Sequence, residues 1–497
     1  MSAADAHLWG DLSEDRASES ILEAALAAVD VPGVSYADVR LVEAQELRLY
    51  STAEAGVDER VESNLGIGIR VLFDGSWGFA SIPLASSRDI ATVADRALSN
   101  ARSAAAVPNA YRTVLPPMPA ASGRHETQVH IDPFDVAAGT RYTLLNDILA
   151  AASAPDQVVT AQAGLNAKRQ HRHFASTEGS RQHQHFIESG AMAMVNAAGN
   201  GTVQRRSFPN SFHGNTAAAG WEYVEGLRMV EEADRIGREA VELLTAPLAP
   251  SGYADFIIGP AQMALQIHES TGHALELDRI LGDEANYAGT SFIGPDAAGS
   301  LRYGSPAVNI TADPTVPGTR GSFGFDDEGV PASRQPLIVE GFIQNYLSTR
   351  DSAARIGATT TGAGRSDGWG YLPVCFATNV FLEPGTGSTD ELLDRLGDGF
   401  YIDDNRSWSI DERRLNFQFG TEVAYEVKNG RRGRLLRGFS YGGTTPQFWQ
   451  SVEAVAGPEE FKAFGMPCGK GEPKQWGFLG HGASPTLVRN VRIGVDR

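Results

Sequence analysis

The sequence predicts an α+β protein in which an N-terminal antiparallel sheet with helices is followed by a β-rich, barrel-like C-terminal domain. In the N-terminal half, runs that alternate apolar and polar residues are joined by tight turns and separated by segments of helical period. Between residues 300 and 450, most patterned runs have the period of strands. A helix predicted over 225–244 is stopped by a segment with two prolines and a glycine, so we predict domains at 1–245 and 246–497.

The N-terminal elements follow from hydrophobic periodicity. We predict, in order, a helix over 18–29, a strand over 36–51, a strand over 66–73 and an alanine-rich helix over 88–104. Asp74-Gly75 is a strong hairpin signal and Trp77 begins the returning strand, which makes this strand pair antiparallel. Five prolines between residues 107 and 133 predict an extended strap or linker.

A second hairpin is predicted to carry four histidines on one face. Thr177-Glu178-Gly179 has the pattern of a three-residue loop with Gly179 in the left-handed conformation. The predicted cross-strand pairs are His171 with His185 and His173 with His183. Because alternate side chains of a strand share a face, the four imidazoles gather on one side. A second metal site or a pH-sensitive cluster is one interpretation, and we favour a polar strand face at an interface or substrate cleft.

The stretch most informative about function is His268-Glu269-Ser-Thr-Gly272-His273. Neutral imidazoles are good zinc ligands, and a neighbouring carboxylate can take a proton from a coordinated water. On a regular α-helix, residues five apart lie about 140° apart around the axis, so the two histidines could not share a metal. Either the helix ends near Gly272 or it contains a π-bulge. Gly272 suits both alternatives, because glycine costs little at unusual backbone angles.

The third candidate ligand is a cysteine far along the chain. The chain has two cysteines, and Cys468 lies in a glycine-rich stretch two residues before Lys470. A nearby ammonium and a metal both favour the thiolate form of a cysteine. The candidate zinc ligands are therefore His268, His273 and Cys468. Three protein ligands with a water in the fourth position are typical of catalytic zinc, and one Zn²⁺ per chain is expected. Glu269 would be the general base.

Composition limits the partners and the compartment. The chain of 497 residues has a formal net charge of −19, which argues against nucleic acid and against anionic membranes as partners. Two cysteines exclude a disulfide framework and favour a reducing compartment. We see neither a signal-peptide pattern nor an apolar run of 18 residues, so a cytoplasmic protein without a membrane segment is expected.

The motifs together resemble the TldD/PmbA family of metallopeptidases. The segment His268-Glu-Ser-Thr-Gly-His-Ala-Leu-Glu-Leu-Asp278 and the later Pro467-Cys-Gly-Lys470 resemble the two signatures of its TldD-type catalytic subunits. Further similar segments lie at 66–80, 325–331 and 417–430, so that the resemblance covers roughly residues 35 to 495. One difference is Ala274, where the family more often has glycine, and this changes no ligand.

The resemblance implies a peptidase that acts on unfolded or short peptides in an enclosed chamber, with 246–497 as the metallopeptidase domain. Glu276 and Asp278 follow the motif as in the family, and we expect them to hydrogen-bond a ligand histidine rather than to act in catalysis. Family members commonly pair with a metal-lacking paralogue. This chain would be the catalytic partner of such a heterodimer, or would form a homodimer.

Two alternatives to a zinc peptidase stay open at the level of sequence. A zinc amidase or hydrolase that tailors a small peptide-like metabolite would use the same site, and the range of accepted substrates would distinguish it. A non-enzymatic peptide-binding partner would keep its function after Glu269→Ala. The intact Glu269 beside His268 argues against that alternative, because a binding scaffold needs no base beside a metal ligand.

Overall fold

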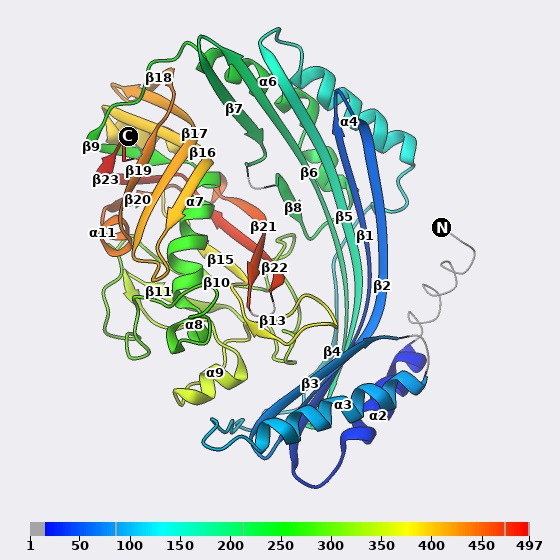
Figure 1. Cartoon of the computed structure of the whole chain (residues 1–497). Coiled ribbons are helices and arrows are strands. Elements are labelled where there is room, and N and C mark those ends of the chain that lie inside the picture. Colours follow the sequence, from blue (N-terminus) through cyan, green and yellow to red (C-terminus); the bar gives the residue numbers. More distant parts are fainter. Residues whose placement is uncertain (1–14, 85–86, 212, 472–473, 496–497) are drawn as a thin grey trace.

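The computed structural model describes residues 15–84, 87–211, 213–471 and 474–495, and its architecture is mixed α+β as predicted (Figure 1). Two halves follow one another along the chain. The first is a large, mainly antiparallel sheet with helices on one of its faces, and the second is a compact β-rich half built around a short helix. None of the helices within the described ranges has the length and apolarity needed to cross a membrane.

The first half is organised by an eight-stranded sheet. Its central path runs β3-β2-β1-β5-β6-β4, and β7 and β8 also pair with β6. The strands are β1 (Val34–Thr52), β2 (Gly56–Phe73), β3 (Ser76–Pro83), β4 (Ser122–Glu126), β5 (Val158–Ser176), β6 (Arg181–Gly199), β7 (Thr202–Phe208) and β8 (Asn215–Ala217). The predicted hairpins on either side of Asp74-Gly75 and Thr177-Glu178-Gly179 are both present. Strands of up to 19 residues make the sheet a tall, curved wall (Figure 1).

Helices cover the outer face of this wall in two groups (Figure 1). Near one end, α2 (Asp15–Val29) and α3 (Ser87–Ala105) bury alanine, leucine and valine side chains against β1, β2 and β3. Near the other end, α4 (Ala138–Ala152), α5 (Trp221–Gly226) and α6 (Met229–Leu243) pack on β5 and β6. The predicted helices at 18–29 and 88–104 correspond to α2 and α3. The proline-rich strap is extended and contributes β4, which pairs in parallel with β6.

A small closed barrel forms one part of the second half. The strands β16, β9, β23, β19 and β17 pair in that order, and β17 pairs back with β16, which closes a five-stranded ring. The barrel strands and the two strands attached to them are β9 (Gly252–Ile258), β16 (Gly399–Ile410), β17 (Asn416–Lys428), β18 (Arg431–Leu436), β19 (Ser440–Thr444), β20 (Val452–Val455) and β23 (Thr486–Ile493). The barrel-like C-terminal half expected from the sequence is therefore confirmed.

A six-stranded sheet lies beside the barrel, with the central helix α7 (Pro260–Ile267) between them (Figure 1). Its order is β12-β11-β10-β15-β22-β21, and β13 and β14 form a separate two-stranded ladder. These strands are β10 (Ile310–Ala312), β11 (Gln335–Val339), β12 (Phe342–Ile343), β13 (Gly364–Arg365), β14 (Val374–Cys375), β15 (Asn379–Leu382), β21 (Lys462–Lys470) and β22 (Gln475–Ala483). Short helices complete this half: α8 (Leu277–Leu281), α9 (Arg350–Arg355), α10 (Thr389–Leu396), α11 (Thr445–Gln450) and a 3₁₀ turn at Pro458–Glu460.

Buried ion pairs join the two halves. Arg70 on β2 donates to Glu328 at 2.8 Å, and Arg172 on β5 donates to Asp327 at 2.7 Å. Within the wall, Arg70 also donates to Asp38 of β1 at 2.6 Å. All five side chains are largely shielded from solvent. A buried charge is tolerated only when it is paired, so these contacts fix the wall against the β-rich half. The acidic turn at 326–328 is thus buried, and two of its carboxylates bind arginines of the wall.

Candidate metal centre

Gly259, Pro260 and Asp403 fix the position at which the central helix begins. Gly259 is extended, and Pro260 occupies the first helical position, where its missing N–H costs nothing. The Oδ1 atom of Asp403 accepts from the backbone N–H of Gln262 at 3.0 Å and so serves one of the unpaired donors of the first turn. All eight residues of α7 are buried. The helix is therefore a core element that delivers its C-terminal end to a fixed place.

At that end the helix widens into a π-turn. Residues His268–Gly272 are π-helical, and the N–H of His273 bonds the carbonyl of His268, five residues back. A 3₁₀ turn at His273–Leu275 follows. The π-turn absorbs the extra residue of the H-E-x-x-x-H spacing, so that His268 and His273 share one side. Of the two alternatives derived from the sequence, the structure has the π-bulge.

The π-turn does not use the conformational freedom of glycine at Gly272. Its backbone angles are φ −51° and ψ −65°, which lie in the right-handed helical region open to every L-residue. The expectation that glycine serves an unusual conformation here is therefore wrong. Several residues with nearly regular helical backbone angles together produce the π-turn, and no single residue has an unusual conformation.

Cys468 reaches the two histidines from β21. Its Sγ lies 3.3 Å from Nε2 of His273, and the three candidate ligand atoms all lie within 4.8 Å of one another. Within the described part of the chain this is the one group of three or more potential metal ligands that meets that criterion. Two imidazole nitrogens and a thiolate are a donor set that suits zinc, so the residues present fit the ion.

A buried carboxylate fixes the orientation of His273. The Oε2 atom of Glu276 lies 3.0 Å from Nδ1 of His273, which leaves Nε2 facing Cys468. Lys470 donates to Glu276 at 2.9 Å and to Asp278 at 2.8 Å. Burial raises the pKa of Glu276, but the charges of Lys470 and His273 outweigh it and hold that pKa well below its ordinary value. Glu276 is therefore ionised and accepts the ligand's second N–H.

Asp278 contacts Lys470 rather than a histidine. Burial is the largest effect on its carboxyl group and raises the pKa to about 6, although the ammonium of Lys470 opposes the shift. Lys470 also does not activate Cys468 as the sequence suggests. Burial, followed by the charges of Glu269 and Glu276, raises the pKa of the Cys468 thiol to about 12, and the lowering effect of Lys470 is too small to reverse this. A thiolate at this position therefore requires the charge of a metal.

His481 contacts a candidate ligand and is not among the residues predicted from the sequence. It lies on β22, is fully buried, and its Nε2 is 2.8 Å from Nδ1 of His268. Its own Nδ1 lies 3.3 Å from the carbonyl of Val380, so Nδ1 carries the proton and Nε2 accepts from His268. Burial lowers the pKa of His481 to about 3, which keeps it neutral. His268 consequently presents Nε2 to the centre.

Arg414 is the second residue that the sequence analysis missed. It lies in the turn between β16 and β17 and forms an ion pair with Glu269. The side chains of Glu269 and Arg414 are 9% and 14% exposed, so this pair is screened only weakly by solvent. The candidate general base therefore has a cationic partner within the metal centre. No spacing rule links positions 269 and 414, and the contact arises only from folding.

The four histidines of the β5–β6 hairpin pair in the predicted register. His171 lies opposite His185 and His173 opposite His183, with ring centroids 4.1 Å and 4.2 Å apart and ring planes nearly parallel. Nδ1 of His171 and Nε2 of His183 are 3.2 Å apart. The four rings are stacked side by side, and they do not meet the distance criterion that His268, His273 and Cys468 satisfy.

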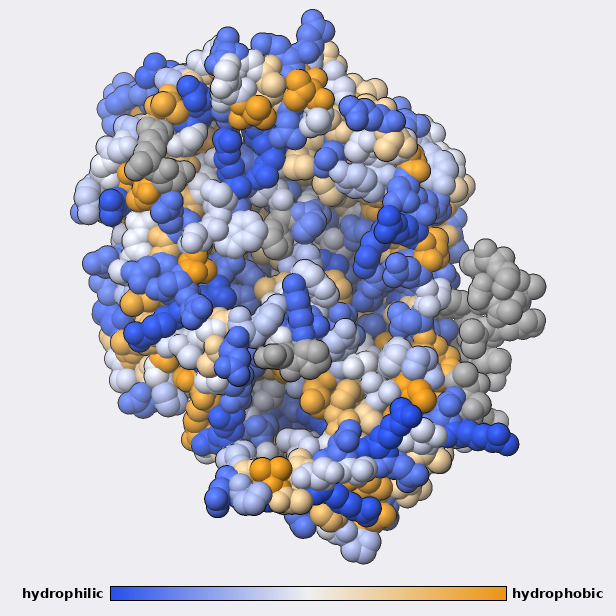
Figure 2. All heavy atoms as spheres, in the orientation of Figure 1, coloured by the Kyte–Doolittle hydropathy of each residue, from blue (hydrophilic) through white to orange (hydrophobic). Residues whose placement is uncertain are grey.

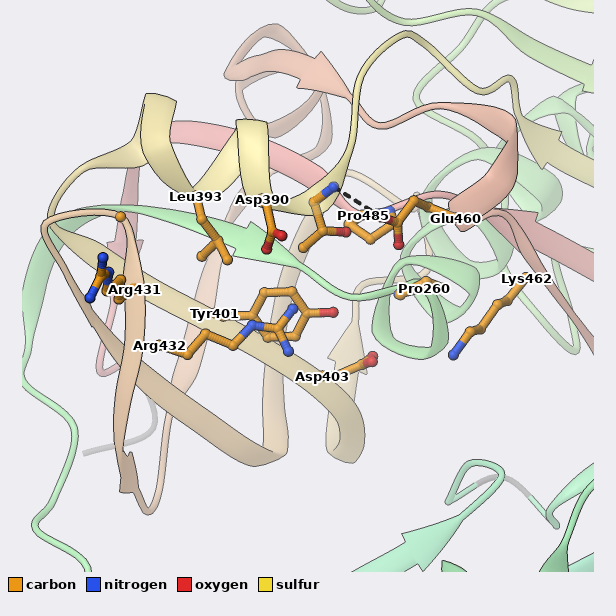
Figure 3. Close-up of a pocket in the computed structure, with 12 residues that line it drawn as sticks. Pro260, Asp390, Leu393, Tyr401, Asp403, Arg431, Arg432, Glu460, Lys462 and Pro485 are labelled. Atoms are coloured by element: carbon orange, nitrogen blue, oxygen red, sulfur yellow. Dashed lines mark hydrogen bonds between the residues drawn. The ribbon is translucent and has the colours of Figure 1, made fainter.

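A cavity of about 590 Å³ lies at the other end of the central helix (Figure 3). Pro260, Tyr401, Asp403 and Lys462 are among the residues that line it. The eight residues of α7 separate Pro260 from His268 by about 12 Å at 1.5 Å per residue. None of the candidate ligands lines this cavity, so it is distinct from the metal centre.

Comparisons with known proteins agree with the motifs. Three sequence models of one family match the chain: PmbA/TldA metallopeptidase domain 1 at residues 37–101, the central domain at 131–248 and the C-terminal domain at 251–494. A metalloprotease of Methanocaldococcus jannaschii is 27% identical over 88% of this chain and 92% of its own length. A zinc metalloprotease TldD homolog of Saccharolobus solfataricus is 23% identical over 52% of this chain and 55% of its length.

The fold is shared with a solved structure. The crystal structure of TldE from Thermococcus kodakarensis aligns with a TM-score of 0.74 over 96% of this chain and 99% of that chain. The sequence identity of this pair is 15%, so the match shows a common fold and nothing finer.

Proposed function

The chain belongs to the PmbA/TldD family of metallopeptidases, and on that premise we propose that it is a zinc-dependent peptidase that hydrolyses peptide bonds in unfolded or short peptides. The observation that carries the proposal is the convergence of His268, His273 and Cys468 beside Glu269. His268 begins the π-turn, His273 directly follows it, and Cys468 lies 195 positions after His273, so folding and not sequence proximity brings the three side chains together. We place the site in the domain formed by residues 246–497.

His268, His273 and Cys468 would hold the zinc ion. When bound, zinc would lower the pKa of a water molecule to about 7 and would polarise a carbonyl group. The chain's own residues then have separate tasks. His481 and Glu276 hold the ligand imidazoles in one tautomer, and Lys470 holds Glu276 in place. A site whose ligands are fixed in advance loses little freedom when the metal binds.

Glu269 is the proposed proton carrier. It directly follows the ligand His268, so its carboxylate is kept at the centre by the same π-turn. As general base it takes a proton from the attacking water, and as general acid it returns that proton to the leaving amine. The side chain is 9% exposed, which limits competing proton exchange with solvent.

Extended peptides are the proposed substrates. Cys468 lies on β21, a strand of the β-rich half that contacts β8 of the wall, and we propose that a peptide reaches the centre between the two halves. Figure 2 shows that the molecular surface is hollowed in this region and that hydrophilic side chains gather around the hollow. Strand edges next to such a space can bind a peptide through its main chain and so accept many sequences. The resemblance to TldD-type subunits, which commonly pair with a metal-lacking paralogue, motivates a proposal about the assembly. We propose that the protein acts as a homodimer or with a metal-lacking paralogue.

Metal content and hydrolysis test the proposal together. The purified protein should hold about one zinc per chain and cleave unstructured peptides of varied sequence. Glu269→Gln should keep the zinc and lose the cleavage, whereas Cys468→Ser should lose both. Cleavage of one small amide alone would favour a narrower amidase. Peptide binding by the parent and by Glu269→Ala, with no hydrolysis in either, would instead identify a peptide-binding partner.

A further inference from the structure

The turn that carries Arg414 is built to hold one side chain in a fixed place. Arg414 has φ +61°, a left-handed conformation that side chains other than glycine rarely adopt. Its N–H bonds the carbonyl of Asp411 at 2.9 Å, and its carbonyl accepts from the hydroxyl of Thr445 at 2.6 Å. The carboxylate of Asp411 accepts in turn from the N–H of Leu415 at 2.8 Å. Such a backbone persists only where its surroundings enforce it, and these positions are concentrated at functional sites.

The guanidinium of Arg414 retains donor capacity after it has bound Glu269. Its Nη1 donates to Oε2 of Glu269, but its buried Nε has no hydrogen-bond partner among the described residues. An unpaired buried donor costs about 1–3 kcal/mol, so a further acceptor supplied by a bound substrate would remove this cost. A guanidinium presents its donors in one plane, so it can hold a carboxylate with one edge while another donor faces a second acceptor.

The charge of Arg414 acts on the metal centre itself. Arg414 forms its ion pair with Glu269, which directly follows the candidate ligand His268 in the π-turn, so the cation lies beside the candidate ligands. Burial lowers the pKa of Arg414, and the neighbouring Glu269 opposes that shift. An arginine remains charged in proteins under these conditions, so a permanent cation faces the reacting groups.

We propose that Arg414 is a catalytic residue that donates to the carbonyl oxygen of the scissile peptide as that oxygen becomes negative. The proposal rests on the proposed peptidase function. When water adds to the carbonyl carbon, one water proton passes to Glu269 and negative charge develops on the former carbonyl oxygen. The carboxylate of Glu269 therefore loses its negative charge as the former carbonyl oxygen of the substrate gains one. The interaction of the guanidinium with the oxyanion therefore strengthens as its ion pair with Glu269 weakens.

The remaining step balances without a further reactant. The carbon–nitrogen bond breaks, its electron pair stays on the amine nitrogen, and Glu269 returns the proton to that nitrogen. Arg414 keeps all its protons throughout. An interaction that is stronger in the transition state than in the ground state lowers the barrier, and loss of one oxyanion donor costs about 10²–10³ in kcat in other hydrolases.

The test separates action on the oxyanion from simple positioning of Glu269. In the otherwise native chain, Arg414→Ala should lower kcat for an unstructured peptide about 10²–10³-fold with little change in KM and with zinc content kept. In a Glu269→Gln background, where no carboxylate is left to position, Arg414→Ala should still weaken binding of a phosphinic peptide, a mimic of the tetrahedral intermediate. Binding of the matched ordinary peptide should be unchanged. Equal affinity of Glu269→Gln and Glu269→Gln/Arg414→Ala for the phosphinic peptide would overturn the proposal.

Two further variants protect the experiment against a folding defect. Arg414→Lys keeps the positive charge but loses the planar set of donors. We expect it to lower kcat in the otherwise native chain and to weaken phosphinic-peptide binding in the Glu269→Gln background. This variant tests the proposal even if Arg414→Ala does not fold. Full activity of Arg414→Lys with unchanged phosphinic-peptide affinity would count against the proposal. Arg413→Ala alters an exposed side chain of the same turn and should behave as the parent. Failure of the peptidase function itself is recognised separately, because the unaltered protein would then neither cleave peptides nor bind the phosphinic peptide.

Discussion

Nδ1 of His268 lies 2.8 Å from Nε2 of His481, so a residue of β22 fixes the tautomer of a candidate ligand 213 positions earlier in the chain. We predict that His481→Ala lowers zinc affinity about 10–100-fold, because groups that hold a ligand imidazole typically contribute that much. Competition against a chelating dye measures the change. His130→Ala, which alters an exposed histidine, is the matched control and should leave the affinity unchanged. Equal affinity for His481→Ala and the parent would contradict the positioning role.

The ammonium of Lys470 is the counterion of two buried carboxylates, and its removal should destabilise the fold. Lys470→Met leaves Glu276 and Asp278 in place without their cation. Breaking a buried ion pair from one side typically costs about 3–5 kcal/mol, and we expect a loss of that size in the free energy of unfolding in urea. Lys462→Met changes an exposed residue of the same strand and should have little effect. A similar stability of the two variants would show that the carboxylates find other partners.

The sequence predicts the structure correctly where the conformation depends on residues close together in the chain. Loop length and the position of Gly179 determine the register of the β5–β6 hairpin, so His171 and His185 could be paired before the structure was known. The spacing of His268 and His273 likewise limited the helix to two alternatives. Both conclusions concern residues fewer than 20 positions apart, for which backbone geometry alone is decisive.

The rest of the centre could not be predicted because it depends on packing between distant strands. His481 stands in a glycine-rich strand with no recognisable motif, and Arg414 is one of two adjacent arginines of which the other is exposed. The sequence places Lys470 two residues from Cys468, yet its ammonium binds Glu276 and Asp278 instead. Sequence proximity predicts a contact poorly when a buried carboxylate offers the stronger partner.

Gly272 lies within the metal motif, yet we predict that alanine can replace it. Its backbone is right-handed, and a Cβ atom there would lie 3.6 Å from the carbonyl oxygen of Ile267 and 3.7 Å from Cε1 of His481, which are ordinary contacts. We therefore expect Gly272→Ala to keep its zinc and to stabilise the fold by about 0.4–1 kcal/mol through the unfolded chain. Thermal unfolding and zinc content check this.

Gly259→Ala is the contrasting variant for that experiment. A Cβ atom at position 259 would lie 2.2 Å from Oδ2 of Asp403, the residue that caps the central helix, so we expect a loss of about 1–3 kcal/mol. Loss of zinc in Gly272→Ala would show that the π-turn requires glycine after all.

The stacked histidines of the wall predict how stability depends on pH. Burial, followed by the charges of His185 and His183, lowers the pKa of His171 to about 3, whereas an unfolded histidine has a pKa near 6.5. The unfolded chain therefore binds this proton first as the pH falls, so stability is greatest above pH ~6.5 and declines progressively from there towards pH ~3.

In His171→Gln this contribution is absent, and unfolding between pH 6 and 4 should take up about one proton fewer than in the parent. Urea unfolding at a series of pH values measures the difference as a shallower slope of unfolding free energy against pH. His130→Gln, in which an exposed imidazole is replaced, should retain the slope of the parent. An unchanged slope in His171→Gln would mean that His171 accepts its proton in the folded protein, which requires the stacked rings to separate.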